Sequence, residues 1–438
     1  MLSYANTSAP WNTLPAHKTN YATQYAGLYF SRLATQRPKA FLAAKEAWPG
    51  CNIVPRILDV RSPAAGSGAA ESNLIVIAGT VFLDMPLKPC ILDVVAKESW
   101  VTAPPPRVKY TSDKDKVLLE DESGRLELVG NPIDDGFLVS GVVVALLGYE
   151  NADNQFVVQD ICYPRYSIER PVIDFSGDVY VAFVSGISIG AEFALELELQ
   201  LFLDFISGDF ADTLPSENAS ISRLIIAGNV FAKKNIPELT YAAGSMSKSN
   251  NEIYSPRSLT TVDEVLSQLS SSVHCDLMPG SEDPTNFAMP QRAMPSGLFP
   301  KSRGFSSFQL VSNPYSAILG GVRILGTSGQ NIEDIFKFVE SEDRLGIAER
   351  TLHWAHMAPT APDTLPCYPF IDHDPFIIEA HPDVYFIGNQ PGFATKMSTG
   401  PSGEMTRVIL VPNFATTKSI ALLNLRTKDC SKVSFAKI

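Results

Sequence analysis

Five glycine-containing loops, each after a short apolar run, hold the polar side chains of the second half that are placed to do chemistry. They lie at residues 184–190 (VSGISIG), 227–232 (AGNVFA), 279–283 (PGSED), 325–329 (LGTSG) and 382–391 (PDVYFIGNQP). Loops that follow the strands of an α/β sheet gather at one edge, where such folds place their functional groups. A two-metal centre at such an edge needs carboxylate or imidazole donors to balance about four positive charges.

Three groups, the last of them inside the loop at 279–283, have types and spacings that suggest ligands or acid–base catalysts. His353 and His356 have the i, i+3 spacing of a metal pair, but no third ligand is placed by motif, so we expect a buried or hydrogen-bonded pair. Residues 372–374 (DHD) are expected to decorate an exposed, proline-bounded loop. Glu282 and Asp283 are adjacent carboxylates without a metal or nucleophile, so we expect them to cap a loop or helix.

Composition limits the classes of function. The 438 residues are 45% hydrophobic, 19% charged and carry a net charge of −12, which suits two or three domains with a sizeable core. An acidic chain is poorly suited to grip nucleic acid unaided, because phosphate neutralisation needs clustered Lys and Arg. The six dispersed cysteines form no CxxC pair, and the first residues lack a secretory-signal pattern. We therefore expect an intracellular protein from a reducing compartment.

The first half of the chain is predicted to form a helix followed by a small β-barrel. Aromatic and leucine side chains recur at helical spacing between Tyr21 and Leu33, and Pro38 is expected to interrupt that helix. Strand-like runs follow at residues 73–80, 116–120, 125–129, 137–147 and 155–162. We expect an arm and helix over 1–45, packed on the second half, and an OB-fold domain over 46–168.

The second half, residues 169–438, alternates strands with helices. The runs at 179–184, 223–227, 276–279 and 384–387 are typical of strands, and 262–269 is typical of a helix. Leucines alternate with glutamates in 191–206 as in a strand, but the strong helix formers and the length favour a helix. The fold class is therefore a multidomain α+β or α/β chain.

In order and spacing, the five loops resemble those of calcineurin-like metallophosphoesterases, which read D-x-H, G-D-x-x-D, G-N-H-D, H-G and G-H-x-H. The resemblance places the seven metal-ligand positions at Gly186, Ser188, Asn229, Ser281, Ser328, Asn389 and Pro391. It places the catalytic histidine at Glu282. None of the seven positions offers a carboxylate or imidazole. The resemblance thus implies an α/β sandwich that keeps the fold and has lost the metal site, with no cofactor.

A barrel followed by an inactivated phosphoesterase resembles the B-subunit family of eukaryotic replicative DNA polymerases, most closely its delta branch. The resemblance covers nearly the whole chain, and its most specific motifs are residues 280–284 (GSEDP), 358–365 (APTAPDTL) and 388–390 (GNQ). It implies a non-catalytic nuclear subunit for replication and repair. Such a subunit joins the catalytic subunit's Cys-rich C-terminal tail to a third, clamp-binding subunit. In fungi it is also expected to serve polymerase zeta in translesion synthesis.

Two alternatives stay open at this point. An active metal-dependent phosphodiesterase or nuclease is disfavoured by the missing ligands. A single-stranded-DNA-binding OB module needs a basic groove with exposed aromatics. The predicted barrel is rich in Val, Leu and acidic residues instead, although Lys88, Lys97 and Lys109 could contact DNA weakly.

A partner surface is predicted in the proline-rich segment 357–376. The low charged fraction suggests that partners cover part of the molecule. Leu365, Tyr368 and Phe370 are the apolar side chains expected to contact a partner there.

Overall fold

The structure is a computed structural model of the chain. It describes residues 2–11, 20, 22–60, 74–89, 107–134, 137–168, 175, 177–190, 196–208, 220–232, 254–401 and 403–435. These form two compact units. Unit 1 combines residues 1–19, 169–330 and 381–438, and unit 2 combines residues 20–168 and 331–380. Among the helices described, none is long and apolar enough to cross a membrane.

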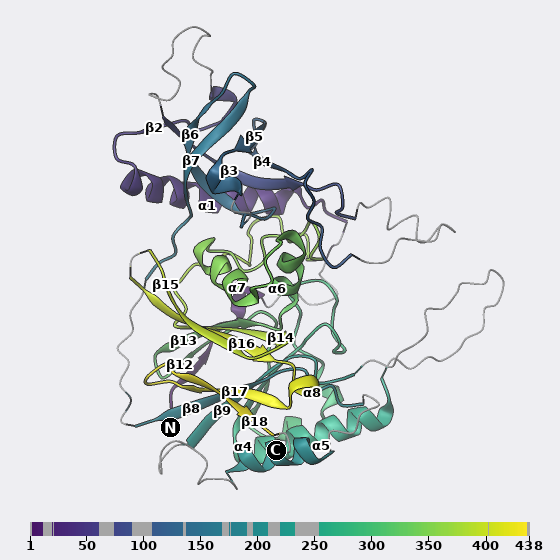
Figure 1. The fold of residues 1–438 in the computed structure, drawn as a ribbon. Coiled ribbons are helices and arrows are strands. Elements are labelled where there is room, and N and C mark those ends of the chain that lie inside the picture. Colours follow the sequence, from purple (N-terminus) through teal and green to yellow (C-terminus); the bar gives the residue numbers. More distant parts are fainter. Residues whose placement is uncertain are drawn as a thin grey trace, which may run out of the picture. The chain divides into compact units, whose positions relative to one another are not determined.

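Unit 1 contains two six-stranded sheets (Figure 1). Sheet one has the order β11 (Phe308–Leu310), β10 (His274–Met278), β9 (Ser220–Ala227), β8 (Val179–Val184), β17 (Ser419–Asn424), β18 (Cys430–Ser434). Sheet two has the order β1 (Tyr4–Asn6), β12 (Tyr315–Leu319), β13 (Val322–Thr327), β14 (Val384–Gln390), β16 (Met405–Pro412), β15 (Ala394–Thr399). Strands β8 to β11 are parallel, as are β13, β14 and β16. Their carboxyl ends therefore share an edge within each sheet.

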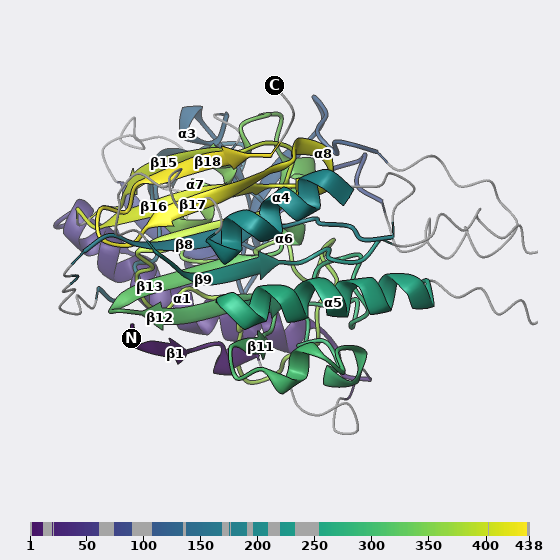
Figure 2. The same ribbon diagram turned by 90° about the horizontal axis from the view of Figure 1, so that it is seen from below.

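The central strands of sheet one are apolar on both faces because both faces are covered. In β8, Val181 and Phe183 pack toward sheet two, while Ala182 and Val184 face the helices. Helices α4 (Glu196–Ser207) and α5 (Pro256–Ser272) cover that outer face, and Figure 2 shows them side by side along it. Strands buried on both faces read as continuous hydrophobic runs, which is why they were recognisable in the sequence.

Unit 2 is built around a closed β-barrel. Its strands are β2 (Asn52–Ile53), β3 (Ile75–Asp84), β4 (Lys116–Glu120), β5 (Arg125–Val129), β7 (Gln155–Cys162) and β6 (Val143–Glu150), in that order. Pairing of β3 with β6 closes a barrel of β3, β4, β5, β7 and β6, and β2 pairs with the start of β3. The turn between β4 and β5 is held by Asp121, whose Oδ1 accepts hydrogen bonds from the backbone N–H groups of Ser123 and Gly124.

Helix α1 (Ala26–Ala47) packs on this barrel through Ala40 and Ala44, which contact β3 and β6. The helix continues through Pro38, so the expected interruption there is wrong. Proline removes one backbone hydrogen bond and crowds the preceding turn, a cost of about 3 kcal/mol in an unsupported helix. Here α1 buries small residues against the barrel on the C-terminal side of Pro38, and that burial offsets the cost.

The remaining elements are short. The α-helices are α3 (Asn131–Asp134), α6 (Gln330–Ile335), α7 (Arg344–His353) and α8 (Phe414–Thr417). The 3₁₀ turns are η1 (Ala9–Trp11), η3 (Ile57–Asp59), η6 (Ser296–Leu298), η7 (Ser302–Gly304) and η8 (Phe336–Phe338).

The division of the chain differs from the expected one in two places. Residues 331–380, expected in the second domain, belong to unit 2 with the barrel. The expected arm and helix also separate: β1 pairs with β12 in unit 1, whereas α1 belongs to unit 2. The helix at 191–206 is present over 196–207, and 191–195 lie outside the described residues.

Candidate functional site

The loops singled out in the sequence converge in unit 1, at the carboxyl ends of β8, β9, β10, β13 and β14. The N–H of Gly186 donates to the carbonyl of Gly228 at 2.9 Å, which joins the loops after β8 and β9. The hydroxyl of Ser185 accepts from the N–H of Asn389 at 2.8 Å, which joins the two sheets. We call Gly186, Asn229, Asp283, Ser328 and Asn389 the loop cluster.

Two asparagine side chains bind the loop cluster together. The Asn389 amide nitrogen donates to the carbonyls of Ala227 (3.2 Å) and Ser328 (2.8 Å) and lies 3.0 Å from the Ser328 hydroxyl. The Asn229 amide oxygen accepts from the N–H of Glu282 at 3.0 Å. Both asparagines have positive φ, a conformation that Asn adopts more readily than most residues. Amide groups thus make contacts between loops at positions where the family resemblance expects metal ligands.

Gly186 has no room for a side chain. Its φ of +63° favours glycine, and a Cβ placed on it would lie 2.2 Å from the Asn413 amide nitrogen and 2.9 Å from the Asn389 amide oxygen. Gly228 is similarly restricted, because a Cβ there would lie 2.2 Å from the Ser328 hydroxyl. The space in front of both glycines is therefore filled by polar side chains of the same unit.

Asp283 is the carboxylate of the loop cluster, and it is buried. Its Oδ2 accepts from the N–H groups of Asn229 (2.7 Å) and Gly280 (2.8 Å), and its Oδ1 accepts from Phe231 N–H (3.0 Å). Burial raises its pKa to about 6, against the opposing effect of these hydrogen bonds. The expectation that Asp283 caps a loop is confirmed.

The other predicted positions are more dispersed. Ser188 donates its backbone N–H to the carbonyl of Asn229, whereas Ser281 and Pro391 are exposed. In the part of the chain that the structure describes, no three His, Cys, Asp or Glu side chains are grouped to hold a metal ion. The donor set of the loop cluster, two amides, one hydroxyl and a carboxylate already engaged by three N–H groups, does not fit a two-metal centre.

Unit 2 contains a buried charged network that the local sequence patterns do not predict. Asp374, expected on an exposed loop, is buried, and its Oδ2 lies 2.6 Å from Arg32 Nε and 2.9 Å from His356 Nε2. The other Arg32 nitrogens donate to the carbonyls of Gly141, Pro359 and Ala361. Only Asp372 and His373 of the DHD sequence are exposed, so the expectation for Asp374 is wrong. For His356, the expected buried, hydrogen-bonded state is confirmed.

The predicted partner residues are mostly internal. Leu365 and Phe370 are each 7% exposed, so they are not available to a partner on the surface of unit 2. Tyr368 is half-buried, and its hydroxyl accepts from Asn20 N–H at 3.2 Å. The segment folds its apolar groups inward around the Asp374 network and exposes Ile371 instead, with 57% of its surface accessible.

Comparison with known proteins gives two family matches. Residues 24–161 match the OB-fold domain of the DNA polymerase delta subunit, which confirms the OB-fold for the barrel. Residues 181–395 match the DNA polymerase alpha/epsilon B-subunit. The chain is thus a mixed α/β multidomain protein with an OB-fold domain and a B-subunit domain.

Relatives cover nearly the whole chain. It is 39% identical to the DNA polymerase delta small subunit of Arabidopsis thaliana, over 94% of this chain and 91% of that protein. It is 33% identical to DNA polymerase delta subunit 2 of Drosophila melanogaster, over 95% and 94%. The DNA polymerase II small subunit of the archaeon Methanothermobacter thermautotrophicus is 26% identical over 64% of this chain and 58% of that protein. At this identity and coverage, the chain belongs to the DNA polymerase delta small-subunit family.

Proposed function

We propose that this chain is a non-catalytic accessory subunit of DNA polymerase delta, with a phosphodiesterase-like domain that has lost its metal site. In this role it links the catalytic subunit's Cys-rich C-terminal tail to the clamp-binding third subunit in the nucleus, for DNA replication and repair. Membership of the delta small-subunit family supports the accessory role. Unit 1, with its loops at the carboxyl ends of two packed sheets, is the part proposed to be phosphodiesterase-like.

The packing around Gly186 is the observation that best supports the loss of the metal site. By resemblance this position held the first aspartate of a metal site, yet its Cβ space is occupied by the amides of Asn389 and Asn413. An aspartate could enter only if both amides moved, and Asn413 also caps α8 through its Oδ1. Amide oxygens carry no negative charge to balance two divalent ions. The loop cluster is therefore suited to hold loops together and unsuited to metal-assisted hydrolysis.

Direct DNA binding by the barrel has weaker support. Lys88 is ion-paired with Asp363 at 2.8 Å. Lys109 donates to the carbonyls of Val339 and Ser341 and lies 3.3 Å from Glu342. Both lysines thus have partners within unit 2, which reduces what they offer to phosphate groups. Lys97 lies outside the described residues.

The test combines reconstitution with an activity assay. Co-expression of the full chain with the catalytic subunit's tail and the third subunit should yield a ternary complex, and omission of this chain should separate the other two. In parallel, manganese calorimetry and a model diester assay on the isolated chain should show neither stoichiometric binding nor turnover. Tight manganese binding with turnover would favour the phosphodiesterase alternative, and a tail that binds the third subunit without this chain would remove the linking role.

A further inference from the structure

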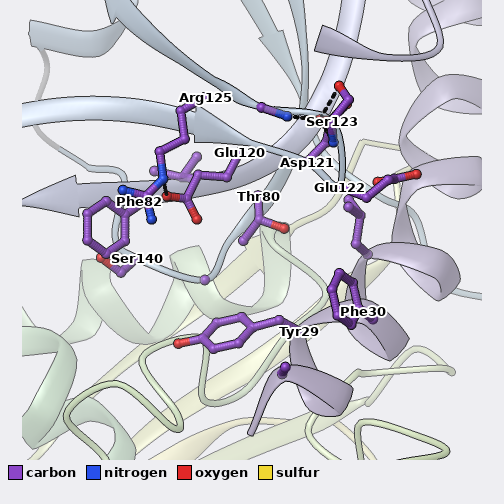
Figure 3. Close-up of a pocket in the computed structure, with 15 residues that line it drawn as sticks. Tyr29, Phe30, Thr80, Phe82, Glu120, Asp121, Glu122, Ser123, Arg125 and Ser140 are labelled. Atoms are coloured by element: carbon purple, nitrogen blue, oxygen red, sulfur yellow. Dashed lines mark hydrogen bonds and ion pairs between the residues drawn. The ribbon is translucent and has the colours of Figure 1, made fainter. Parts of the chain in front are cut away.

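A pocket of about 600 Å³ opens in unit 2 between α1 and the barrel. One face of α1 forms its first wall through Ala26, Tyr29, Phe30 and Leu33, which follow the i, i+3, i+4, i+7 spacing of a helix face. Figure 3 shows Tyr29 and Phe30 pointing from α1 toward the barrel residues. Phe30 keeps 60% of its surface accessible. An aromatic side chain held this far out of the core beside a cavity is a typical anchor for a partner.

The barrel supplies the second wall, with an apolar ring and a hydroxyl. Phe82 on β3 lies near two cations, with Lys88 Nζ 4.9 Å and Arg125 Cζ 5.2 Å from its ring centre. Thr80 lies between Glu120 and Tyr29 in Figure 3. Burial raises the pKa of Tyr29 to about 12, so its hydroxyl stays protonated at neutral pH. The lining therefore combines three aromatic rings with hydroxyl and charged groups that give a ligand direction.

The turn between β4 and β5 gives the pocket a negative charge. Its lining includes the carboxylates of Glu120, Asp121 and Glu122 and one cation, Arg125. With Arg37, which pairs with Glu122 from outside the lining, these groups keep a net negative charge. Arg125 is ion-paired with Glu120, yet burial still raises the pKa of Glu120. Negative charge in a partly enclosed aromatic site attracts a cation, whose alkyl stem packs on the rings.

This negative turn is held rigidly. Asp121 accepts from the N–H of Ile57 at 2.8 Å as well as from those of Ser123 and Gly124. Glu122 forms a two-point ion pair with Arg37 on α1, at 2.7 and 2.9 Å. The turn is thus fixed to both walls of the pocket. A preformed site loses little conformational entropy when a partner binds.

We propose that this pocket is the docking site for a partner-protein segment that inserts an apolar side chain next to a lysine or arginine. The inference deepens the proposed function and rests on it, since the partner is taken to be a subunit of the same polymerase complex. The apolar side chain packs against Phe30 and Leu33, and the cation lies against the three carboxylates. Nucleic acid is excluded as the occupant, because its phosphates would meet this negative turn.

Two sets of variants of the full chain test the proposal. Phe30→Glu removes the exposed anchor, and Phe287→Glu is its matched control, because Phe287 is an 80% exposed phenylalanine of unit 1. Arg37→Glu combined with Glu122→Arg reverses an ion pair that links α1 to the turn. The reversal keeps the pair and the total charge but places the positive charge at the lining position. Melting curves establish that each variant is folded before binding is measured.

Binding is measured by titrating each variant with the catalytic subunit's C-terminal tail and, separately, with the third subunit, at low and high salt. One of the two should bind Phe30→Glu roughly 30-fold more weakly, as expected for a hot-spot aromatic, and bind Phe287→Glu like the unchanged chain. For that partner, the charge-reversed variant should bind more weakly and with a smaller salt dependence. If both partners bind Phe30→Glu and the charge-reversed variant with unchanged affinity, the pocket is not their docking site, and the proposed function stays intact. If neither partner binds the unchanged chain, the proposed function fails first and the pocket proposal fails with it.

A cross-link identifies the segment itself. A benzoylphenylalanine at position 30, irradiated in the reconstituted complex, should attach to an apolar residue that has a lysine or arginine beside it. A cross-link to an acidic or purely polar segment, or to DNA, would contradict the proposed chemistry. Absence of any cross-link to either subunit would contradict the docking.

Discussion

Two buried carboxylates, Asp283 of unit 1 and Asp374 of unit 2, are stabilised by different means. In unit 2, Asp374 is paired with the Arg32 guanidinium and hydrogen-bonded to His356. In unit 1, Asp283 accepts three backbone N–H groups, and the described hydrogen bonds to it include none from a cationic side chain. Burial acts on both to raise the pKa. With Arg32 nearby the pKa of Asp374 falls well below its usual range, whereas that of Asp283 rises to about 6.

The difference shows what each site is suited to do. A full positive charge makes Asp374 a permanent anion, and Arg32 uses its other nitrogens to hold two separate chain segments through their carbonyls. Backbone dipoles alone position the loops around Asp283 but do not offset its desolvation near neutral pH. The network of unit 2 is therefore a strong structural link, and the loop cluster of unit 1 is a weaker one that depends on pH.

The largest expected effect comes from replacing Arg32, the buried cation that pairs with Asp374. Arg32→Met leaves Asp374 buried without its charge partner and three carbonyls without a donor, so we expect unfolding to become easier by about 3–5 kcal/mol. Hydrogen exchange should localise the loss of protection to residues of unit 2. Arg37→Met, which breaks the partly exposed pair with Glu122, is the control and should cost less than about 1 kcal/mol. Equal losses in the two variants would show that Arg32 is not a special link.

A smaller effect, dependent on pH, is expected for the loop cluster. The pKa of Asp283 rises from 3.8 in the unfolded chain to about 6 in the fold, so its contribution to stability falls as the pH rises through that window. Asp283→Asn removes this dependence but leaves at least one N–H group without an acceptor. The variant should therefore be most destabilised at low pH, by about 3 kcal/mol more than at neutral pH. Urea unfolding across this range, with Asp372→Asn as the exposed control, checks the sign.

Glycine substitutions compare the space available in the two units. Gly186→Ala places a methyl group against the Asn413 amide, whereas Gly50→Ala in unit 2 meets no atom within 4 Å. Both positions have positive φ, so both variants share the backbone strain. Gly186→Ala should cost about 2 kcal/mol more, because it adds overpacking to that strain. Similar melting temperatures for the two variants would mean that the loop cluster is loosely packed.

The smallest effect concerns His356. Burial lowers its pKa below the ordinary 6.5, against the opposing charge of Asp374, so the imidazole is neutral in the fold. The unfolded chain takes up a proton first as the pH falls, and this part of the stability is lost below 6.5. The free energy of unfolding should therefore fall as the pH drops below about 6.5, and His356→Gln should remove that slope. If the pH dependence of stability is the same in the variant, it arises from groups other than His356.

The local elements, the order of the loops and the family can be predicted from the amino-acid sequence. Strands such as β8 and β9 are buried on both faces, and their hydrophobic runs identify them without any partner. The five loops could be placed because each follows such a run, and the structure brings Gly186, Asn229, Ser328 and Asn389 together. The types of residue at these positions, already visible in the sequence, are poor metal donors.

Which polar and apolar groups are buried depends on contacts that form only in the folded chain. Arg32 and Asp374 are 342 residues apart, and a carboxylate in a proline-bounded segment is normally exposed unless a distant cation pairs with it. The same fold buries Leu365 and Phe370, carries α1 through Pro38 and joins residues 331–380 to the barrel. Local patterns reveal whether a segment has the periodicity of a helix or of a strand. Charge compensation and packing depend instead on contacts between segments far apart in the chain.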